Sequence, residues 1–113
     1  MKIEKSLLSG STPMLVLALL KDGDKYGYEM ISQLALRSEG VFELKEGTLY
    51  PVLHQLEREG SLESYTAQAP SGRTRKYYHL TPKGVRALEA QEAEYRRITG
   101  AVEQVLRQSK VMA

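Results

Sequence analysis

The sequence predicts a mainly α-helical domain with one small β-hairpin. Apolar residues recur at spacings of three and four in four separate stretches, a pattern typical of helices that bury one face. Before the last of these stretches, residues 62–80 alternate and are rich in tyrosine, as expected of a hairpin. A chain of 113 residues, 42% apolar and 27% charged, can bury a single modest core.

The first two helices are predicted to lie before residue 40. A hydroxyl N-cap and a first-turn proline within Ser11–Pro13 indicate the start of a helix that ends near Lys21, while an additional turn over residues 3–9 stays open. A turn over residues 21–25 leads to a second helix from about Tyr26 to Ser38. The apolar face of this helix is expected to contain Tyr28, Ile31, Leu34 and Ala35.

A short extended piece at residues 41–44 precedes the third predicted helix. This helix begins within Lys45–Leu49 and ends at Gly60, a residue suited to the C′ position. Pro51 would cost ~3 kcal/mol in a helix interior and little near the first turn, so we expect a late start or a local bend. The apolar stripe consists of Leu49, Val52, Leu53 and Leu56.

The hairpin is expected to pair residues 62–67 with residues 75–80 across the turn cluster 69–72. Leu80 should point into the core, and the two-residue period then turns Tyr78 inward as well. The same period leaves Arg73 and Arg75 free on the other face. One face thus carries Arg73, Arg75, Tyr77 and His79, and the other carries Lys76, Tyr78 and Leu80.

The last helix is predicted to be capped by Thr81–Pro82 and to run from about Lys83 to Lys110. Its length of ~42 Å exceeds what a domain of this size needs for its own core. The apolar residues therefore predict contact with another chain, with packing over the N-terminal helices of the same chain as the alternative. The expected dimer interface contains Leu88, Tyr95, Ile98, Val102 and Val105, and Met112 continues the repeat.

The order helix, helix, helix, hairpin, helix is that of a winged helix-turn-helix. We expect residues 1–82 to form a DNA-binding domain and residues 83–113 a dimerisation helix, together one compact unit. The overall net charge of +2 conceals an asymmetry, because residues 64–88 contain no acid and carry +5 while the rest of the chain carries −3. Such a basic segment indicates an anion-binding patch, and a solvated basic hairpin is the alternative.

Chemistry suited to DNA gathers at the start of the third helix. Lys45 can bind a phosphate or a guanine edge, Thr48 a phosphate or a thymine methyl group, and Tyr50 a phosphate. His54, about one turn later, is placed to reach a base. Plainer roles stay open: Thr48 as an N-cap, Tyr50 as an aromatic at the edge of the core, and His54 as a surface histidine.

Enzyme signatures are missing from the sequence. The chain has no cysteine, which excludes disulfides, thiolate zinc sites and a cysteine nucleophile. His54 and His79 lack metal-ligand spacing, and there is no glycine-rich phosphate loop or serine elbow. We therefore expect no catalysis, metal or cofactor. The longest apolar run, Met14–Leu20, is too short to span a bilayer, so a cytoplasmic protein is expected.

Three motifs resemble the PadR family of bacterial transcriptional regulators: Tyr26–Glu29, Glu46–Glu57 and Arg75–Gly84. The single C-terminal helix is similar to that of the smaller subclass. The resemblance implies a homodimeric repressor that binds a palindromic operator in double-stranded DNA. It leaves open whether Tyr26 and Tyr28 contact phosphate or brace the third helix. The DNA-binding positions it implies are Lys45, Gly47, Thr48, Tyr50, Pro51, His54, Gly72, Arg73, Arg75 and Lys76.

The resemblance also implies release of DNA by a small aromatic or lipophilic effector. A pocket between the last and first helices would be lined by Leu15, Leu19, Tyr95 and Ile98, unless these residues are simply core. The alternative function is a winged-helix interaction module that binds an acidic protein partner without DNA and forms a heteromeric coiled coil. A dimeric ligand-binding protein without DNA binding is a third option, which the intact segment Lys45–His54 disfavours.

Overall fold

The computed structural model describes residues 5–109, with side chains described from Gly10 onward. It confirms a mainly helical fold with a small antiparallel sheet. Residues 1–4 and residues 110–113 lie outside the described residues, and with them Met112 of the predicted α4 repeat. The elements in chain order are α1 (Lys5–Lys21), β1 (Lys25–Tyr26), α2 (Gly27–Arg37), α3 (Glu46–Arg58), β2 (Leu62–Gln68), β3 (Thr74–Leu80) and α4 (Pro82–Gln108).

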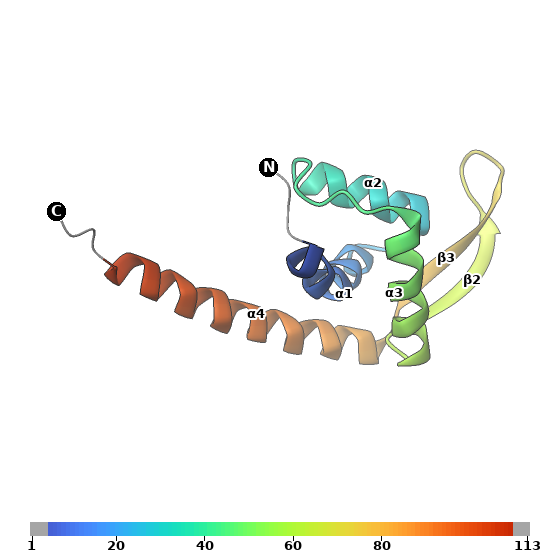
Figure 1. Cartoon of the computed structure of the whole chain (residues 1–113). Coiled ribbons are helices and arrows are strands. Elements are labelled where there is room, and N and C mark those ends of the chain that lie inside the picture. The colour runs from blue at the N-terminus through green and yellow to red at the C-terminus, as the bar shows by residue number, and fades with distance from the viewer. Residues whose placement is uncertain (1–4, 110–113) are drawn as a thin grey trace.

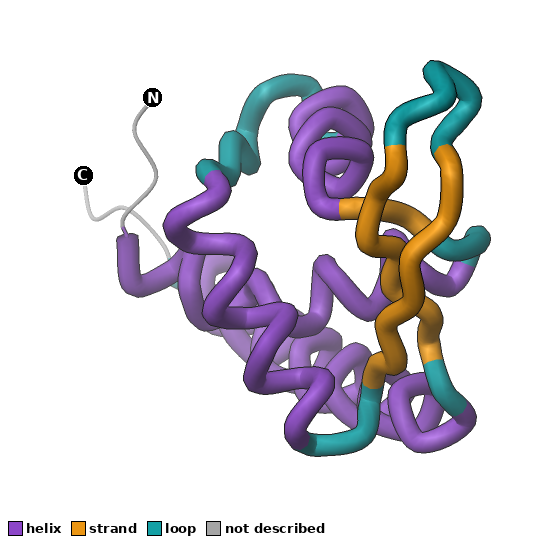
Figure 2. Tube along the Cα trace, turned by 90° about the vertical axis from the view of Figure 1, so that its right-hand side faces the viewer, coloured by secondary structure: helices purple, strands orange, loops and turns teal. Residues whose placement is uncertain are grey.

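The elements form a three-helix body with two projections. Figure 1 shows α1, α2 and α3 grouped together, the β2–β3 hairpin on one side and α4 extending away on the other. We call the hairpin, residues 62–80, the wing. Figure 2 shows the two long strands side by side up to their connecting loop, and α2 leading directly out of the short strand β1. The molecule measures 63 × 30 × 21 Å, and α4 accounts for much of its length.

The core lies where the three body helices meet the inner face of the wing. The predicted inward direction of Tyr78 and Leu80 is confirmed, since Tyr78 is only 1% exposed. The α3 stripe is confirmed too. The buried apolar residues are Val16, Leu17, Leu19, Leu20, Met30, Leu34, Leu44, Leu49, Leu53, Leu56, Leu62, Tyr78, Leu80 and Leu88.

Helix α1 begins earlier than predicted. It starts at Lys5 and contains Pro13 in its interior, so the expected cap at Ser11–Pro13 is wrong. Proline removes one backbone hydrogen bond from a helix. The completely buried residues Val16 and Leu17 follow directly, and their packing offsets that loss. Thr12 is itself buried rather than capping an exposed helix end.

Helix α2 confirms the predicted span and most of the predicted face, since Leu34 is buried and Ile31 packs against the core. Tyr28 was expected on the apolar side and is instead 64% exposed, while Met30 and Leu34 are buried. The residue before α2 belongs to a strand that the sequence did not predict. In this strand Lys25 pairs with Tyr78 and Tyr26 with Tyr77, which makes a three-stranded sheet of order β1-β3-β2.

Helix α3 starts at Glu46, within the predicted range Lys45–Leu49 but near its early end, so Pro51 lies inside the helix and the late start within that range is wrong. The carbonyl of Lys45 accepts hydrogen bonds from the N–H groups of Thr48 and Leu49, both at 3.0 Å, which fixes the first turn well before the proline. The preceding residues 41–45 form no strand, and buried Leu44 anchors them to the core. The helix ends as predicted, with Gly60 in the left-handed region at φ 80°.

Helix α4 begins as predicted. The hydroxyl of Thr81 accepts the N–H of Gly84 at 3.1 Å and donates to the carbonyl of Gly60 at 2.6 Å, which ties the start of α4 to the end of α3. A β-carbon on Gly84 would collide with the carbonyl of Ser61. Within residues 5–109, no helix is long and apolar enough to cross a membrane.

Candidate nucleic-acid interface

The outward face of α3 is available to a partner. Gly47, Tyr50, Pro51 and His54 lie three and four residues apart, so they share one side of the helix. The opposite side carries the buried leucines of the core. Lys45 and Thr48 are exposed at the same end. All the α3 residues predicted to bind DNA are therefore exposed, and Tyr50 is not a core residue.

The loop of the wing is a tight five-residue connection. The N–H of Ala69 donates to the carbonyl of Arg73, and the N–H of Gly72 donates to the carbonyl of Ala69, both at 2.8 Å. Gly72 has a φ of 88°, a conformation that glycine adopts without strain. Arg73 and Lys76 are exposed beside it. The wing thus presents basic side chains next to a residue without a side chain.

Arg75 is less free than the sequence predicts. Its guanidinium carbon lies 5.1 Å from the ring centroid of Tyr26, a cation–π contact that leaves the residue only partly exposed. The Nε atom of Arg75 is buried and has no hydrogen-bond partner among residues 5–109. The expectation that Arg75 stands free must be corrected: β1, which the sequence did not reveal, brings Tyr26 beneath it.

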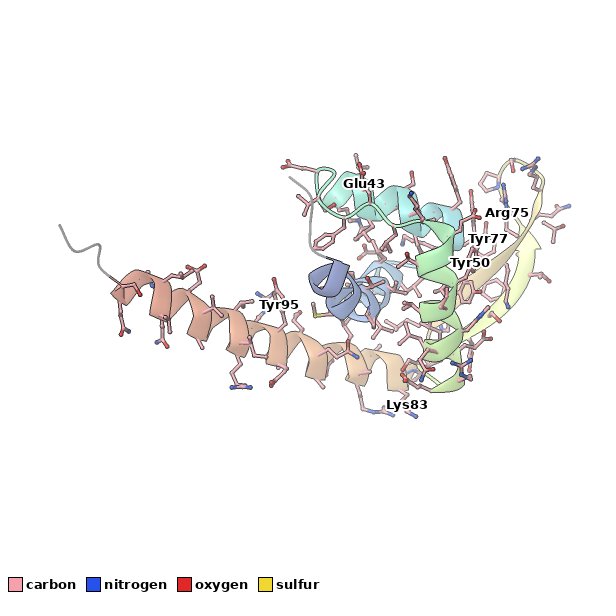
Figure 3. All side chains as sticks on the ribbon, viewed as in Figure 1. Glu43, Tyr50, Arg75, Tyr77, Lys83 and Tyr95 are labelled. Atoms are coloured by element: carbon pink, nitrogen blue, oxygen red, sulfur yellow. The ribbon has the colours of Figure 1, made fainter. Side chains whose placement is uncertain are left out.

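A hollow of about 530 Å³ separates the wing from the starts of α2 and α3. Figure 3 shows Tyr50, Tyr77 and Arg75 in this region between α3 and the wing. The hollow combines three basic side chains of the wing with one acid, Glu46, and with the first residues of α2. It is lined by Tyr26, Gly27, Tyr28, Glu46, Tyr50, Arg73, Thr74, Arg75 and Lys76.

The electrostatics of this hollow favour an anion. The N-terminal end of a helix carries unpaired N–H groups and the positive end of the helix dipole, and α2 starts at Gly27 on the lining. The carboxylate of Glu29 accepts the N–H of Tyr26 at 3.2 Å, which fixes this helix start. A phosphate here would meet arginine and lysine side chains together with tyrosine hydroxyls.

The outer face of the wing carries contacts that the sequence did not reveal. Asp24, in the turn before β1, accepts hydrogen bonds from Tyr65 at 2.5 Å and from Nδ1 of His79 at 2.8 Å. Partial burial raises the pKa of Asp24, but these hydrogen bonds outweigh it and hold the pKa below its ordinary value. The hydrogen bond to Asp24 raises the pKa of Tyr65 to about 12.

The distal half of α4 presents an unpartnered apolar surface. From Ala93 to Ser109 every residue except Thr99 is exposed, and Val102 is 50% exposed. Leu88, expected at a dimer interface, lies instead in the core of its own chain, 7% exposed. The sequence interpretation did not include Leu106, which belongs to this exposed apolar surface and is 62% exposed. A groove of about 380 Å³ on this surface is lined by Arg97, Ile98, Ala101, Val102, Val105 and Leu106.

The four residues predicted to line an effector pocket lie in two different places. A hollow of about 250 Å³ lies between α1 and α4 and includes Tyr95 and Ile98. Leu19 is buried in the core and Leu15 packs against it, so neither lines this hollow. The α1 side consists of Gly10, Ser11 and Met14. The apolar stripe of α1 therefore serves the core, as the alternative interpretation held.

Comparisons with known proteins agree on one family. A family model described as the transcriptional regulator PadR-like family matches residues 16–90. A PadR family transcriptional regulator from Eggerthella lenta is similar in structure, with a TM-score of 0.78 and 33% identity over 92% of this chain and 88% of that one.

Two further proteins resemble this chain. A PadR-like transcriptional regulator from Bacillus cereus has a TM-score of 0.82 and 27% identity, covering 94% of this chain and 100% of that one. The transcriptional regulator Rv3488 of Mycobacterium tuberculosis is 36% identical over 67 residues, which is 59% of either chain.

Proposed function

The chain belongs to the PadR-like family of transcriptional regulators, and on that premise we propose that it is a homodimeric repressor of a palindromic operator. The observation that carries the proposal is the hollow beside α3. It places Arg73, Arg75 and Lys76 opposite the start of α2, next to the exposed face of α3. Double-stranded DNA offers phosphates beside the edges of its bases in the grooves. A helix start with a flanking wing is a geometry that binds both.

The proposal assigns two kinds of contact. Thr48 and His54 are assigned to the major groove, where they contact bases, because both are exposed, Thr48 on the first turn of α3 and His54 at the start of its third. The phosphate contacts come from the end of the wing and the edge of the hollow. They involve Gly72 at the end of the wing and Tyr50, Arg73, Arg75 and Lys76 on the hollow, which Tyr26 and Tyr28 also line. Lys45, Gly47 and Pro51 on the exposed side of α3 complete the proposed DNA-binding set, with Pro51 contributing only packing because it has no N–H.

The dimer is proposed to form through α4. The surface around Ile98, Val102 and Val105 is apolar over several turns, and each of these three side chains is about half exposed or more. A second copy with the same surface buries it symmetrically, and a two-fold dimer matches a palindromic site. In this arrangement residues 1–82 bind DNA and residues 83–113 dimerise, with the core contact of Leu88 joining the two parts.

The effector is proposed to bind at the hollow between α1 and α4. Tyr95 offers an aromatic face there and Ile98 an apolar one, which suits a small aromatic or lipophilic molecule. A ligand at this junction changes the angle at which α4 leaves the body. In a dimer joined by α4, that angle sets the distance between the two α3 helices.

The proposed regulator acts on cytoplasmic DNA and carries out no catalysis. Within the described residues, no group of three or more His, Asp or Glu side chains is arranged to hold a metal ion. The alternative module that binds an acidic protein would use the same basic wing. It gives no reason for the exposed α3 face beside the wing, so DNA is the favoured partner.

The test is the salt dependence of duplex binding. If each subunit neutralises about four phosphates, the slope of log K against log[salt] is roughly −7 for the dimer. The measurement is fluorescence anisotropy of a labelled mixed-sequence duplex with the full chain, alongside light scattering of the protein alone. A salt slope near zero contradicts the proposal, and so does a protein that light scattering shows to be monomeric on its own. Genomic footprinting then identifies the operator.

A further inference from the structure

We propose that Asp24 is a positioning residue for DNA binding, which acts on Arg75 from the outer face of the wing without touching DNA. The inference rests on the proposed function, because it concerns how the wing presents Arg75 to a phosphate. It adds a residue that lies outside both the α3 segment and the wing. We call Asp24, Tyr65 and His79 together the Asp24 clamp.

The clamp joins three segments that are far apart in sequence. Oδ2 of Asp24 accepts the hydroxyl hydrogen of Tyr65 on β2, and Oδ1 contacts Nδ1 of His79 on β3. These partners are 41 and 55 residues from Asp24. In the β2–β3 register Glu63 pairs with His79 and Tyr65 with Tyr77, so Tyr65 and His79 point to the same face. One carboxylate thus fixes both strands of the wing to the turn before β1.

A line of aromatic contacts runs from the clamp to Arg75. Tyr65 stacks on Tyr77 with ring centroids 5.7 Å apart, and Tyr77 meets Tyr26 edge-on at 5.5 Å. Arg75 is the last member of this line of contacts, with its guanidinium over the ring of Tyr26. Each member touches the next, so the position of Arg75 depends on where Tyr26 is held.

Strand pairing alone holds Tyr26 weakly. Strand β1 is two residues long and pairs with β3 at Lys25 and Tyr26 only. A two-residue strand gives few ladder hydrogen bonds, so side-chain contacts must supply much of the order. The clamp and the tyrosine series are the contacts that connect this strand to β2, with which it shares no ladder.

The guanidinium of Arg75 is oriented by its contact with Tyr26. Its buried Nε finds no hydrogen-bond partner within residues 5–109, and the cation–π contact with Tyr26 is the interaction that orients it. Its remaining donors are thereby left for an anion in the hollow. If Tyr26 is held less firmly, the Arg75 guanidinium can move. Its N–H groups are then no longer held in place for a phosphate.

The decisive variant is Asp24→Asn, with Glu63→Gln as its control. Both remove one negative charge from the same face of the wing, and Glu63 is exposed and outside the clamp. Electrostatics alone predict that either change strengthens binding to DNA. The clamp predicts that Asp24→Asn weakens binding about fivefold while Glu63→Gln does not weaken it. The probe is a fluorescein-labelled 24-base-pair duplex of mixed sequence, added to the full chain at fixed salt.

A second arm separates positioning from general loss of structure. In an Arg75→Ala background, Asp24→Asn should cause no further loss of affinity, because its effect passes through Arg75. Tyr65→Phe keeps the ring on Tyr77 and removes only the hydrogen bond, and it should weaken binding in the same direction. Equal losses with and without Arg75 would overturn the proposal.

A third arm needs no DNA. The Nε–H resonance of Arg75, identified by its disappearance in Arg75→Lys, is expected at a ring-shifted position because it lies over Tyr26. Asp24→Asn should move it toward the position of exposed arginines, and Glu63→Gln should not. An unmoved resonance in Asp24→Asn overturns the proposal. If the wild-type chain binds no duplex while this resonance responds as expected, the proposed function fails and the positioning role stands.

Discussion

The hydroxyl of Tyr50 occupies the space that a β-carbon on Gly27 would need. That carbon would lie 2.6 Å from the hydroxyl oxygen and 3.0 Å from the ring atom that bears it. Gly27 is the first residue of α2 and Tyr50 lies in α3, so the contact sets how closely the two helix starts approach. Both residues line the hollow that we assign to phosphate.

Gly27→Ala should therefore reduce both stability and DNA binding. The methyl group must displace the Tyr50 hydroxyl. Because this oxygen ends a partly exposed side chain that can turn aside, the cost lies near the lower end of the ~1–3 kcal/mol typical of small-to-large changes. Thermal unfolding and duplex anisotropy measure the two effects. Gly100→Ala is the matched control, because nothing lies within 4 Å of its added carbon. Tyr50→Phe in the Gly27→Ala background should recover part of the stability, and no recovery would show that Tyr50 is not the obstacle.

The proposed division between phosphate and base contacts predicts two different phenotypes. Arg73→Ala should weaken all duplexes alike and make the salt slope of the dimer less steep by about 2, one phosphate per subunit. Thr48→Ala should instead change the ranking of sequences, by ~1 kcal/mol at one position in each half-site. Arg107→Ala, which removes the same charge near the far end of α4, is the control. If Thr48→Ala weakens specific and non-specific DNA equally, or if Arg73→Ala changes the ranking of sequences, the assigned roles are wrong.

The sequence predicts the wing well because its information is local. Alternation places Tyr78 and Leu80 inward, and the turn residues before Arg73 supply the loop, as the structure confirms. The start of α4 follows from the cap at Thr81 for the same reason. These features depend on neighbours within a few residues, which a sequence pattern records directly.

What the sequence could not show depends on distant partners. Nothing near Asp24 indicates that its carboxylate meets residues 41 and 55 positions away. Strand β1 is too short to produce an alternating pattern. The alternation of the hairpin is consistent with Tyr65 and Tyr77 on one face, but it does not reveal that Tyr65 bonds to Asp24 in the turn. For Pro13, local helix rules gave the wrong helix start. Pro13 and Pro51 both lie inside helices, because core packing overrides the local cost of proline.

The Asp24 clamp should also appear in the pH dependence of stability. The folded-state pKa of Asp24 is lowered, so its ionisation contributes stability that is complete above its unfolded-state pKa and is lost as pH falls through the folded-state pKa. The pKa of Tyr65 is raised to about 12, so its protonated form contributes stability that is complete below 10.0 and lost as pH rises through about 12.

Ultraviolet absorbance of the tyrosines tests this prediction. One tyrosine should titrate near pH 12 in the wild-type chain, and in Asp24→Asn it should move toward the ordinary value of 10.0. Glu63→Gln should leave the late titration in place, since its carboxylate is not in the clamp. Burial also raises the pKa values of Tyr77 and Tyr78, so the Tyr65 step is identified as the one that Tyr65→Phe removes. If that step stays near pH 12 in Asp24→Asn, the Tyr65–Asp24 hydrogen bond does not set the pKa of Tyr65.

The dimer proposal depends on one face of α4, and a single charge should disrupt it. Val102→Glu places a carboxylate in the centre of the exposed groove, where a second copy would have to bury it unpaired. Light scattering should then report a monomer at micromolar concentration. Gln104→Glu adds the same charge two positions along α4 and outside the groove, so it should leave the dimer intact. Because a palindrome is bound by both subunits together, Val102→Glu should also make the salt slope about half as steep. A dimer that survives Val102→Glu would place the interface elsewhere on the chain and leave the exposed face of α4 to another partner.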